Sequence, residues 1–130
     1  MTNEIPQIIE DVGFDFDWSE EKVWELSEPV TEMPIDQLTW HFDIPFLDEG
    51  GGTYNLKPID VIRDPESHRQ EYDRTMAADM RYPIDIMENK GRLLILDGLH
   101  RLMKASLSGD TVVSVRIIPR ERIPDIQKIV

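Results

Sequence analysis

Residues that could bind a phosphate gather in one short segment of the chain. Gly98 would let a ligand approach the backbone closely. His100 and Arg101 supply an imidazole and a guanidinium, and Lys104 follows at a spacing that lets all three cations share one helix face. A helix N-terminus exposes unpaired N–H groups and carries about half a positive charge. The segment therefore predicts a phosphate-binding site.

The apolar residues around this segment predict the elements that position it. Leu93–Leu96 is an apolar run long enough for a buried strand and too short for a helix. From Leu99 to Ser108 the apolar positions take helical spacing, and Gly109 is the residue type that commonly ends a helix. A strand should therefore lead through one glycine directly into a helix. Asp97, at the junction, could cap that helix or hold Mg²⁺ through water.

A resemblance to a known superfamily begins at the same residues. Asp97-Gly98-Leu99-His100-Arg101 resembles the Gly-x-His-Arg phosphate-binding motif of the ParB/sulfiredoxin superfamily, which includes ParB partition proteins, sulfiredoxins and free-serine kinases. Tyr82–Met87 is similar to the Pro-Ile-Asp strand of sulfiredoxin, and Thr111–Ile118 to the strand after the motif helix. The resemblance covers roughly residues 29–119. It implies a nucleotide site, whose expected residues are Asp97, Gly98, Leu99, His100, Arg101 and, from its spacing, Lys104.

The sequence departs from the superfamily at two of these positions. Leu99 stands where sulfiredoxin has its catalytic cysteine, and the chain contains no cysteine at all. Lys104 stands where the relatives usually have alanine. Sulfiredoxin chemistry is therefore excluded, and the resemblance indicates membership more clearly than any one activity.

The segment Trp40–Asp43 offers candidates for a catalytic base. Free-serine kinases carry Pro-His-Glu at a similar place; His41 matches that histidine, and Asp43 lies one residue beyond the position of the glutamate. The resemblance implies that His41 or Asp43 faces the phosphate site. The alternative interpretation is a loop histidine that is merely solvated or capping. The three histidines lack metal-ligand spacing, so no metal site made of histidines is expected.

Charge is distributed unevenly along the chain. Of 130 residues, 26 are acidic and 14 basic, giving a net charge of −12. Residues 1–60 hold 15 acidic and two basic side chains, a net −13, and the remainder is close to neutral. This balance opposes non-specific DNA binding, which depends on neutralising phosphates. It permits a nucleotide site, because salt screens charges beyond ~8 Å, and it permits a protein partner at the acidic half.

Length and pattern predict one α/β (α+β) domain of the ParB/sulfiredoxin type, with a small mixed sheet and flanking helices. We expect an acidic N-terminal extension at residues 1–28, the core domain at 29–119 and a capping tail at 120–130. The aromatic residues of the extension either cover an open face of the core or bind a partner: Phe14, Phe16, Trp18 and Trp24. No signal peptide or membrane span is visible, so a cytoplasmic protein is expected.

Local signals predict the remaining elements. Ser19 is a good helix cap, and Asp64-Pro65-Glu66 should start a helix that runs to about Met80. That helix should bury Tyr72, Met76 and Met80 and leave His68, Arg69 and Arg74 on a solvated face. Further expected elements are a strand over Val30–Met33, an alternating strand over Tyr82–Glu88, a hairpin turn over Asn89–Arg92, a strand over Thr111–Ile118 and a short helix from Ile123.

Two classes of function fit these observations. The first is an NTPase or small-molecule phosphotransferase that uses a nucleoside triphosphate with Mg²⁺. The second is a non-enzymatic module, either a nucleotide-gated switch or an inhibitor whose acidic face meets a basic partner. A DNA-processing nuclease is a third interpretation, which the negative charge opposes, and the chain ends at Val130 without room for the DNA-reading domain of ParB.

Overall fold

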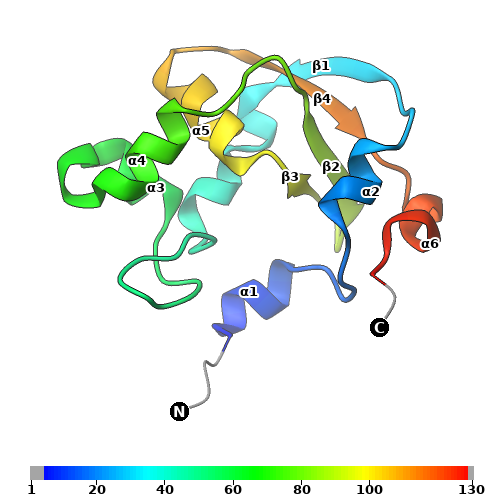
Figure 1. Cartoon of the computed structure of the whole chain (residues 1–130), viewed down its shortest axis with the longest axis horizontal. Helices are drawn as coiled ribbons and strands as arrows, with labels where there is room; N and C mark the ends of the chain where they lie inside the picture. The colour runs from blue at the N-terminus through cyan, green and yellow to red at the C-terminus, as the bar shows by residue number, and fades with distance from the viewer. Residues whose placement is uncertain (1–4, 129–130) are drawn as a thin grey trace.

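A four-stranded mixed sheet lies at the centre of the fold (Figure 1). The structure is a computed structural model that describes residues 5–128. The strands are β1 (Val30–Pro34), β2 (Ile84–Asn89), β3 (Arg92–Asp97) and β4 (Val112–Ile117). Their order is β1-β4-β2-β3, with β2 parallel to β4 and the other neighbours antiparallel. The predicted α/β class with a small mixed sheet and flanking helices is confirmed.

Short helices and 3₁₀ turns surround the sheet. They are α1 (Gln7–Val12), α2 (Glu20–Trp24), η1 (Ile35–Gln37), η2 (Thr39–Asp43), α3 (Pro58–Arg63), η3 (Pro65–His68), α4 (Arg69–Met76), α5 (Leu99–Leu107), η4 (Arg120–Arg122) and α6 (Ile123–Ile126). No helix within residues 5–128 is long and apolar enough to cross a lipid bilayer.

The two faces of the sheet are covered by different helices (Figure 1). Successive strand residues point to opposite faces, so Ile86 joins the larger core cluster and Met87 the smaller one. The larger cluster contains Leu102 and Met103 of α5, and α3 and α4 pack on the same side. The smaller cluster contains residues of α2 and α6. Both faces are therefore buried over the central strands.

The predicted hairpin and motif helix are confirmed. Lys90 and Gly91 join β2 to β3 with φ values of 53° and 82°, the left-handed pair that a tight hairpin turn requires. β3 ends at Asp97, and α5 begins at Leu99, so the chain passes from strand to helix through a single residue. Gly109 has a φ of 79° just beyond the helix, as expected for a helix end.

The alternating pattern predicted for residues 82–88 is wrong. Residues Ile84 to Met87 are all buried, including the carboxyl group of Asp85. The reason is that β2 lies between β4 and β3 and is covered on both faces, so no side of the strand meets solvent.

The single long helix predicted from Asp64 to about Met80 is also wrong, because its first turn is 3₁₀ and its α-helical part is shorter than predicted. Asp64 does cap a turn, because its side chain accepts a hydrogen bond from the Ser67 N–H, but η3 follows and α4 ends at Met76. A 3₁₀ turn rotates the chain more per residue than an α-helix, so a different face meets the core. Glu71 and Thr75 are buried, whereas Tyr72 is only partly buried and both methionines, Met76 and Met80, are exposed.

The N-terminal segment packs against the sheet through its aromatic residues. Phe14 and Trp18 have ring centroids 5.1 Å apart, and together with Phe16 they contact the smaller core cluster. The Trp18 indole N–H donates to the Leu96 carbonyl over 3.0 Å. Ser19 caps α2 as predicted, because its hydroxyl accepts from the Lys22 N–H. Segments about 80 residues apart are thus held side by side.

A buried ion pair joins this segment to the middle of the sheet. Arg116 and Asp85 face each other on β4 and β2, and the arginine Nε donates to Asp85 Oδ1 over 2.7 Å. The same guanidinium donates to the Leu26 carbonyl (2.6 Å) and to the Val23 carbonyl (2.9 Å). It therefore donates to one carbonyl group in the last turn of α2 and to one just after that helix, as well as to the buried carboxylate.

We predict that Arg116→Met lowers the free energy of unfolding by about 3–5 kcal/mol, because it leaves the Asp85 carboxylate buried without its partner. Equilibrium urea unfolding measures this loss. Arg69→Met is the matched control, since Arg69 is an exposed arginine in surface ion pairs and its removal should change little. Equal losses for the two variants would contradict the role given to the buried pair.

Candidate functional site

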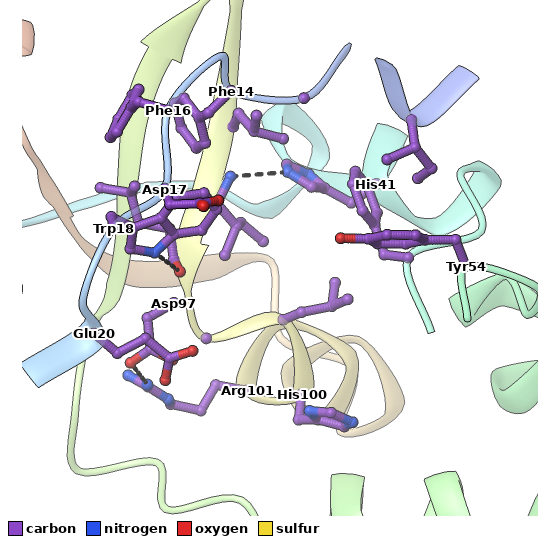
Figure 2. Close-up of a pocket in the computed structure, with 18 of the residues that line it drawn as sticks. Phe14, Phe16, Asp17, Trp18, Glu20, His41, Tyr54, Asp97, His100 and Arg101 are labelled. Atoms are coloured by element: carbon purple, nitrogen blue, oxygen red, sulfur yellow. Dashed lines mark hydrogen bonds and ion pairs between the residues drawn. The ribbon is translucent and has the colours of Figure 1, made fainter. Parts of the chain in front are cut away.

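A cavity of about 700 Å³ lies where the N-terminal segment, the loop before α3 and the start of α5 meet. Figure 2 shows Trp18 and Phe14 on one side of it, Tyr54 on another and Arg101 at the start of α5. Gly98 and Leu99 also line it. Part of the predicted phosphate motif therefore opens onto this cavity.

The first turn of α5 carries no side-chain cap. The backbone hydrogen bond nearest to its start runs from the Leu102 N–H to the Gly98 carbonyl over 3.0 Å. The N–H groups before Leu102 lack intrahelical acceptors, as at every helix start. The prediction that Asp97 could cap this helix is wrong. Its carboxylate instead accepts hydrogen bonds from the side chains of Trp24 and Arg101. The cavity wall thus includes an uncapped helix N-terminus.

Gly98 is required by the backbone and by packing. Its φ is 117°, a conformation that side-chain-bearing residues rarely adopt. A Cβ at this position would lie 3.2 Å from the Cα of Ile84, because the turn passes directly over β2. The glycine of the motif is thus explained within the fold, before any ligand is considered.

Arg101 is held at the edge of the cavity by an internal carboxylate. Its Nη2 donates to Asp97 Oδ2 over 2.8 Å, and its Nη1 donates to the Pro83 carbonyl. The Trp24 indole N–H donates to the same Asp97 oxygen, also over 2.8 Å. Burial, with the nearby Asp97 carboxylate, raises the pKa of Glu20. Two carboxylates and one guanidinium therefore share this end of the cavity (Figure 2).

His100 and Lys104 are engaged elsewhere. His100 Nε2 lies 2.8 Å from the buried carboxylate of Glu71, which also accepts from Arg74 over 3.1 Å. Figure 2 shows the His100 ring directed away from the aromatic residues of the cavity. Lys104 donates to the Met76 and Ala78 carbonyls at 2.8 and 3.1 Å. The prediction that three cations share one phosphate-facing surface is corrected: each has its own intramolecular partner.

His41 is a structural histidine in this fold. It is 1% exposed, its Nδ1 donates to the Leu38 carbonyl over 2.7 Å, and its Nε2 accepts from the Ile95 N–H over 3.1 Å. Burial lowers its pKa to about 4. Although its ring lines the cavity, both nitrogens are occupied, so the expected general base is not available.

Asp43, the other candidate base, lies at the end of η2. It is exposed and does not line the cavity. The sequence-predicted site therefore separates into two parts. Asp97, Gly98, Leu99, His100 and Arg101 border the cavity, whereas Asp43 and Lys104 do not.

Several residues of the cavity were not predicted as site residues. Trp18, Tyr54 and Glu20 come from segments far from the motif in the sequence. Tyr54 has a φ of 50°, which is uncommon for a residue with a side chain, and its N–H is held by the Asp48 carboxylate at 2.9 Å. No local pattern indicates this role, because it depends on which segments meet in the fold.

Comparisons with known proteins find similarity in structure and none in sequence. No family model matches the chain, and no curated protein matches its sequence. The chain is similar to the crystal structure of sulfiredoxin from Arabidopsis thaliana, with 14% sequence identity and a TM-score of 0.38. The match covers 74% of this chain and 93% of the other. At this level the similarity says nothing about the chemistry of the present chain.

The buried imidazole predicts a pH-dependent stability. His41 is neutral in both states at pH 7; as the pH falls from 6.5 to about 4, the unfolded chain binds a proton that the folded chain does not. The free energy of unfolding should therefore fall over this range, by up to about 3 kcal/mol from this group. Urea unfolding at each pH measures the slope.

The variant His41→Gln isolates this effect, because the amide can still accept a hydrogen bond but does not titrate. Its stability should fall less steeply than that of the natural chain between pH 6.5 and 4. Parallel slopes for the two proteins would contradict the neutral, buried state of the imidazole.

Proposed function

We propose that this protein binds a phosphate-bearing ligand of the nucleotide class in the cavity beside α5. The observation that carries the proposal is the uncapped N-terminus of α5, which opens onto the cavity next to the guanidinium of Arg101. Helix N-termini favour anions because their free N–H groups and dipole point at the ligand. A phosphate would lie over the backbone of residues 98–100.

Arg101 supports the proposal through the partner it already has. Its guanidinium contacts a carboxylate oxygen in a largely buried position, with 15% of the arginine and 16% of the aspartate side chain exposed. A phosphate oxygen offers the same geometry and more negative charge. The ligand would share or replace the contact to Asp97, which makes this carboxylate a competitor for the phosphate.

The remainder of the cavity suits a flat, largely apolar group. Trp18, Phe14 and Tyr54 contribute aromatic rings to its walls. A volume of about 700 Å³ falls within the usual range for small-molecule sites. Mg²⁺ commonly binds one or two carboxylates together with the phosphates of the ligand, and Glu20 and Asp97 line the cavity. These two side chains are the proposed protein contacts of a magnesium–nucleotide complex.

We propose binding without turnover as the primary activity. Phosphoryl transfer depends on positioning and on neutralising charge, and general-base assistance adds typically about 10²–10⁴-fold. His41 has both nitrogens engaged, and Asp43 lies outside the cavity. The absence of a free base among the predicted candidates favours a binding module over an efficient NTPase.

Two variants should change affinity in opposite directions. Arg101→Ala should weaken binding by about tenfold or more, because a charge-assisted hydrogen bond contributes ~1.5–3 kcal/mol. Asp97→Asn should strengthen the binding of inorganic phosphate and of nucleotides without Mg²⁺, because it removes the competing negative charge and retains an oxygen that can accept from Trp24 and Arg101. With Mg²⁺ present this gain should shrink, because the variant also loses a proposed contact of the metal ion. Isothermal titration with inorganic phosphate, ATP, ADP, CTP and GTP, with and without Mg²⁺, measures both changes.

Arg69→Ala is the control, since it removes an equal charge from an exposed part of α4 outside the cavity. Thermal unfolding without ligand checks that each variant is folded. Binding that is unchanged in both Arg101→Ala and Asp97→Asn would refute the assignment of the phosphate to α5, and so would equal weakening by Arg69→Ala. Release of phosphate from bound nucleotide would show that the chain is an enzyme.

A further inference from the structure

A second hollow of about 570 Å³ lies near the end of α2 and the start of β1, and three large side chains on its border remain in solvent. Trp24 is 57% exposed, Val30 58% and Tyr82 61%. We propose that this hollow, here called the Trp24–Tyr82 groove, is a docking site for an arginine-bearing, positively charged segment of a partner protein. The groove shares Tyr82 and Arg101 with the cavity of the proposed nucleotide site, but the inference does not require a nucleotide to bind there.

The groove has a fixed framework. The indole N–H of Trp24 is anchored to Asp97, and Glu28 is anchored by Arg122 at 2.8 Å. Its lining includes two arginines, and a carboxylate compensates the charge of each: Asp85 that of Arg116, and Asp97 that of Arg101. An aromatic side chain held in place while exposed loses little conformational freedom when a partner binds. The groove is thus preorganised for a ligand.

The segment of residues 20–34, which contributes Trp24, Glu28 and Val30 to the groove and is here called its rim, is acidic. The segment from residue 20 to 34 holds five glutamates and a single lysine. Within residues 5–128, the structure gives no ion pair to Glu21, Glu25 or Glu32. Glu32 lies two residues after Val30 on β1 and therefore on the same strand face. This unbalanced charge favours a cationic partner over a neutral or an acidic one.

Arginine is the cation that fits both the exposed aromatic rings and the acidic rim of the groove. Its planar guanidinium stacks on Trp and Tyr rings and is weakly hydrated, unlike the lysine ammonium. Tyr82 already receives one guanidinium from within the chain, since Arg81 lies 5.8 Å from its ring centroid. Arginine, Trp and Tyr are also the residues that contribute most to protein interfaces. A partner arginine would therefore stack on Trp24 or Tyr82 and face the glutamates of the rim.

Fluorescence anisotropy with short labelled peptides tests this inference on the full chain. One probe alternates arginine and leucine, and the second alternates glutamate and leucine. The arginine peptide should bind more tightly than the glutamate peptide, and its binding should weaken as salt is raised.

Two variants test the contacts proposed for the arginine peptide. Tyr82→Ala should weaken its binding by at least about threefold, because the variant removes a cation–π contact. Glu32→Gln should also weaken its binding, because the variant removes a negative charge from the rim.

Matched controls remove the same chemistry from outside the groove. Met76→Ala truncates an exposed apolar side chain on α4, and Glu121→Gln removes an exposed carboxylate. Neither should change the affinity. Because Tyr82 is exposed, its truncation should leave thermal unfolding unchanged, which separates lost binding from lost folding. Equal binding of the two peptides, no binding of either, or equal effects of Tyr82→Ala and Met76→Ala would overturn the inference.

Discussion

The buried contact between Asp85 and Arg116 connects more of the structure than any other polar interaction described above. It joins the two parallel strands at the middle of the sheet, and its guanidinium also donates to carbonyl groups at the end of α2 and just after it. The position of α2 in turn sets Trp24, which contacts Asp97 at the start of the motif helix. The Arg116 guanidinium thus holds the N-terminal segment against the sheet, and through α2 it also positions Trp24 beside the phosphate motif.

The second general feature is that the basic side chains of the motif already have partners within the chain. Arg101 has Asp97, His100 has Glu71, and Lys104 has two carbonyl groups at the end of α4. The ligand proposed at α5 would therefore share or replace an existing carboxylate contact of Arg101 instead of meeting an unpaired charge. Such an exchange lowers affinity and raises selectivity, because only a ligand with better geometry or more charge than a carboxylate displaces it.

Features coded by neighbouring residues could be predicted from the sequence, and features that depend on long-range contacts could not. The strand-to-helix junction at Gly98 and the hairpin at Gly91 follow from local residue types. The burial of Asp85 depends on β2 being an interior strand, which local pattern does not reveal. Likewise, the partner of His100 lies 29 residues away, and the role of His41 depends on a contact to a strand 54 residues away. Local spacing indicated which side chains could share a helix face, but not which groups they contact.

Side chains occupy backbone hydrogen-bonding groups of the edge strand β3, and this affects how copies of the chain could associate. β3 lies at one end of the sheet, where His41 accepts from its Ile95 N–H and Trp18 donates to its Leu96 carbonyl. Those backbone groups are no longer free to pair with a foreign strand. At the opposite end, β1 presents the charge of Glu32 and ends in Pro34, which has no N–H to donate. Side chains at both margins thus oppose the edge-to-edge stacking of sheets that leads to aggregation.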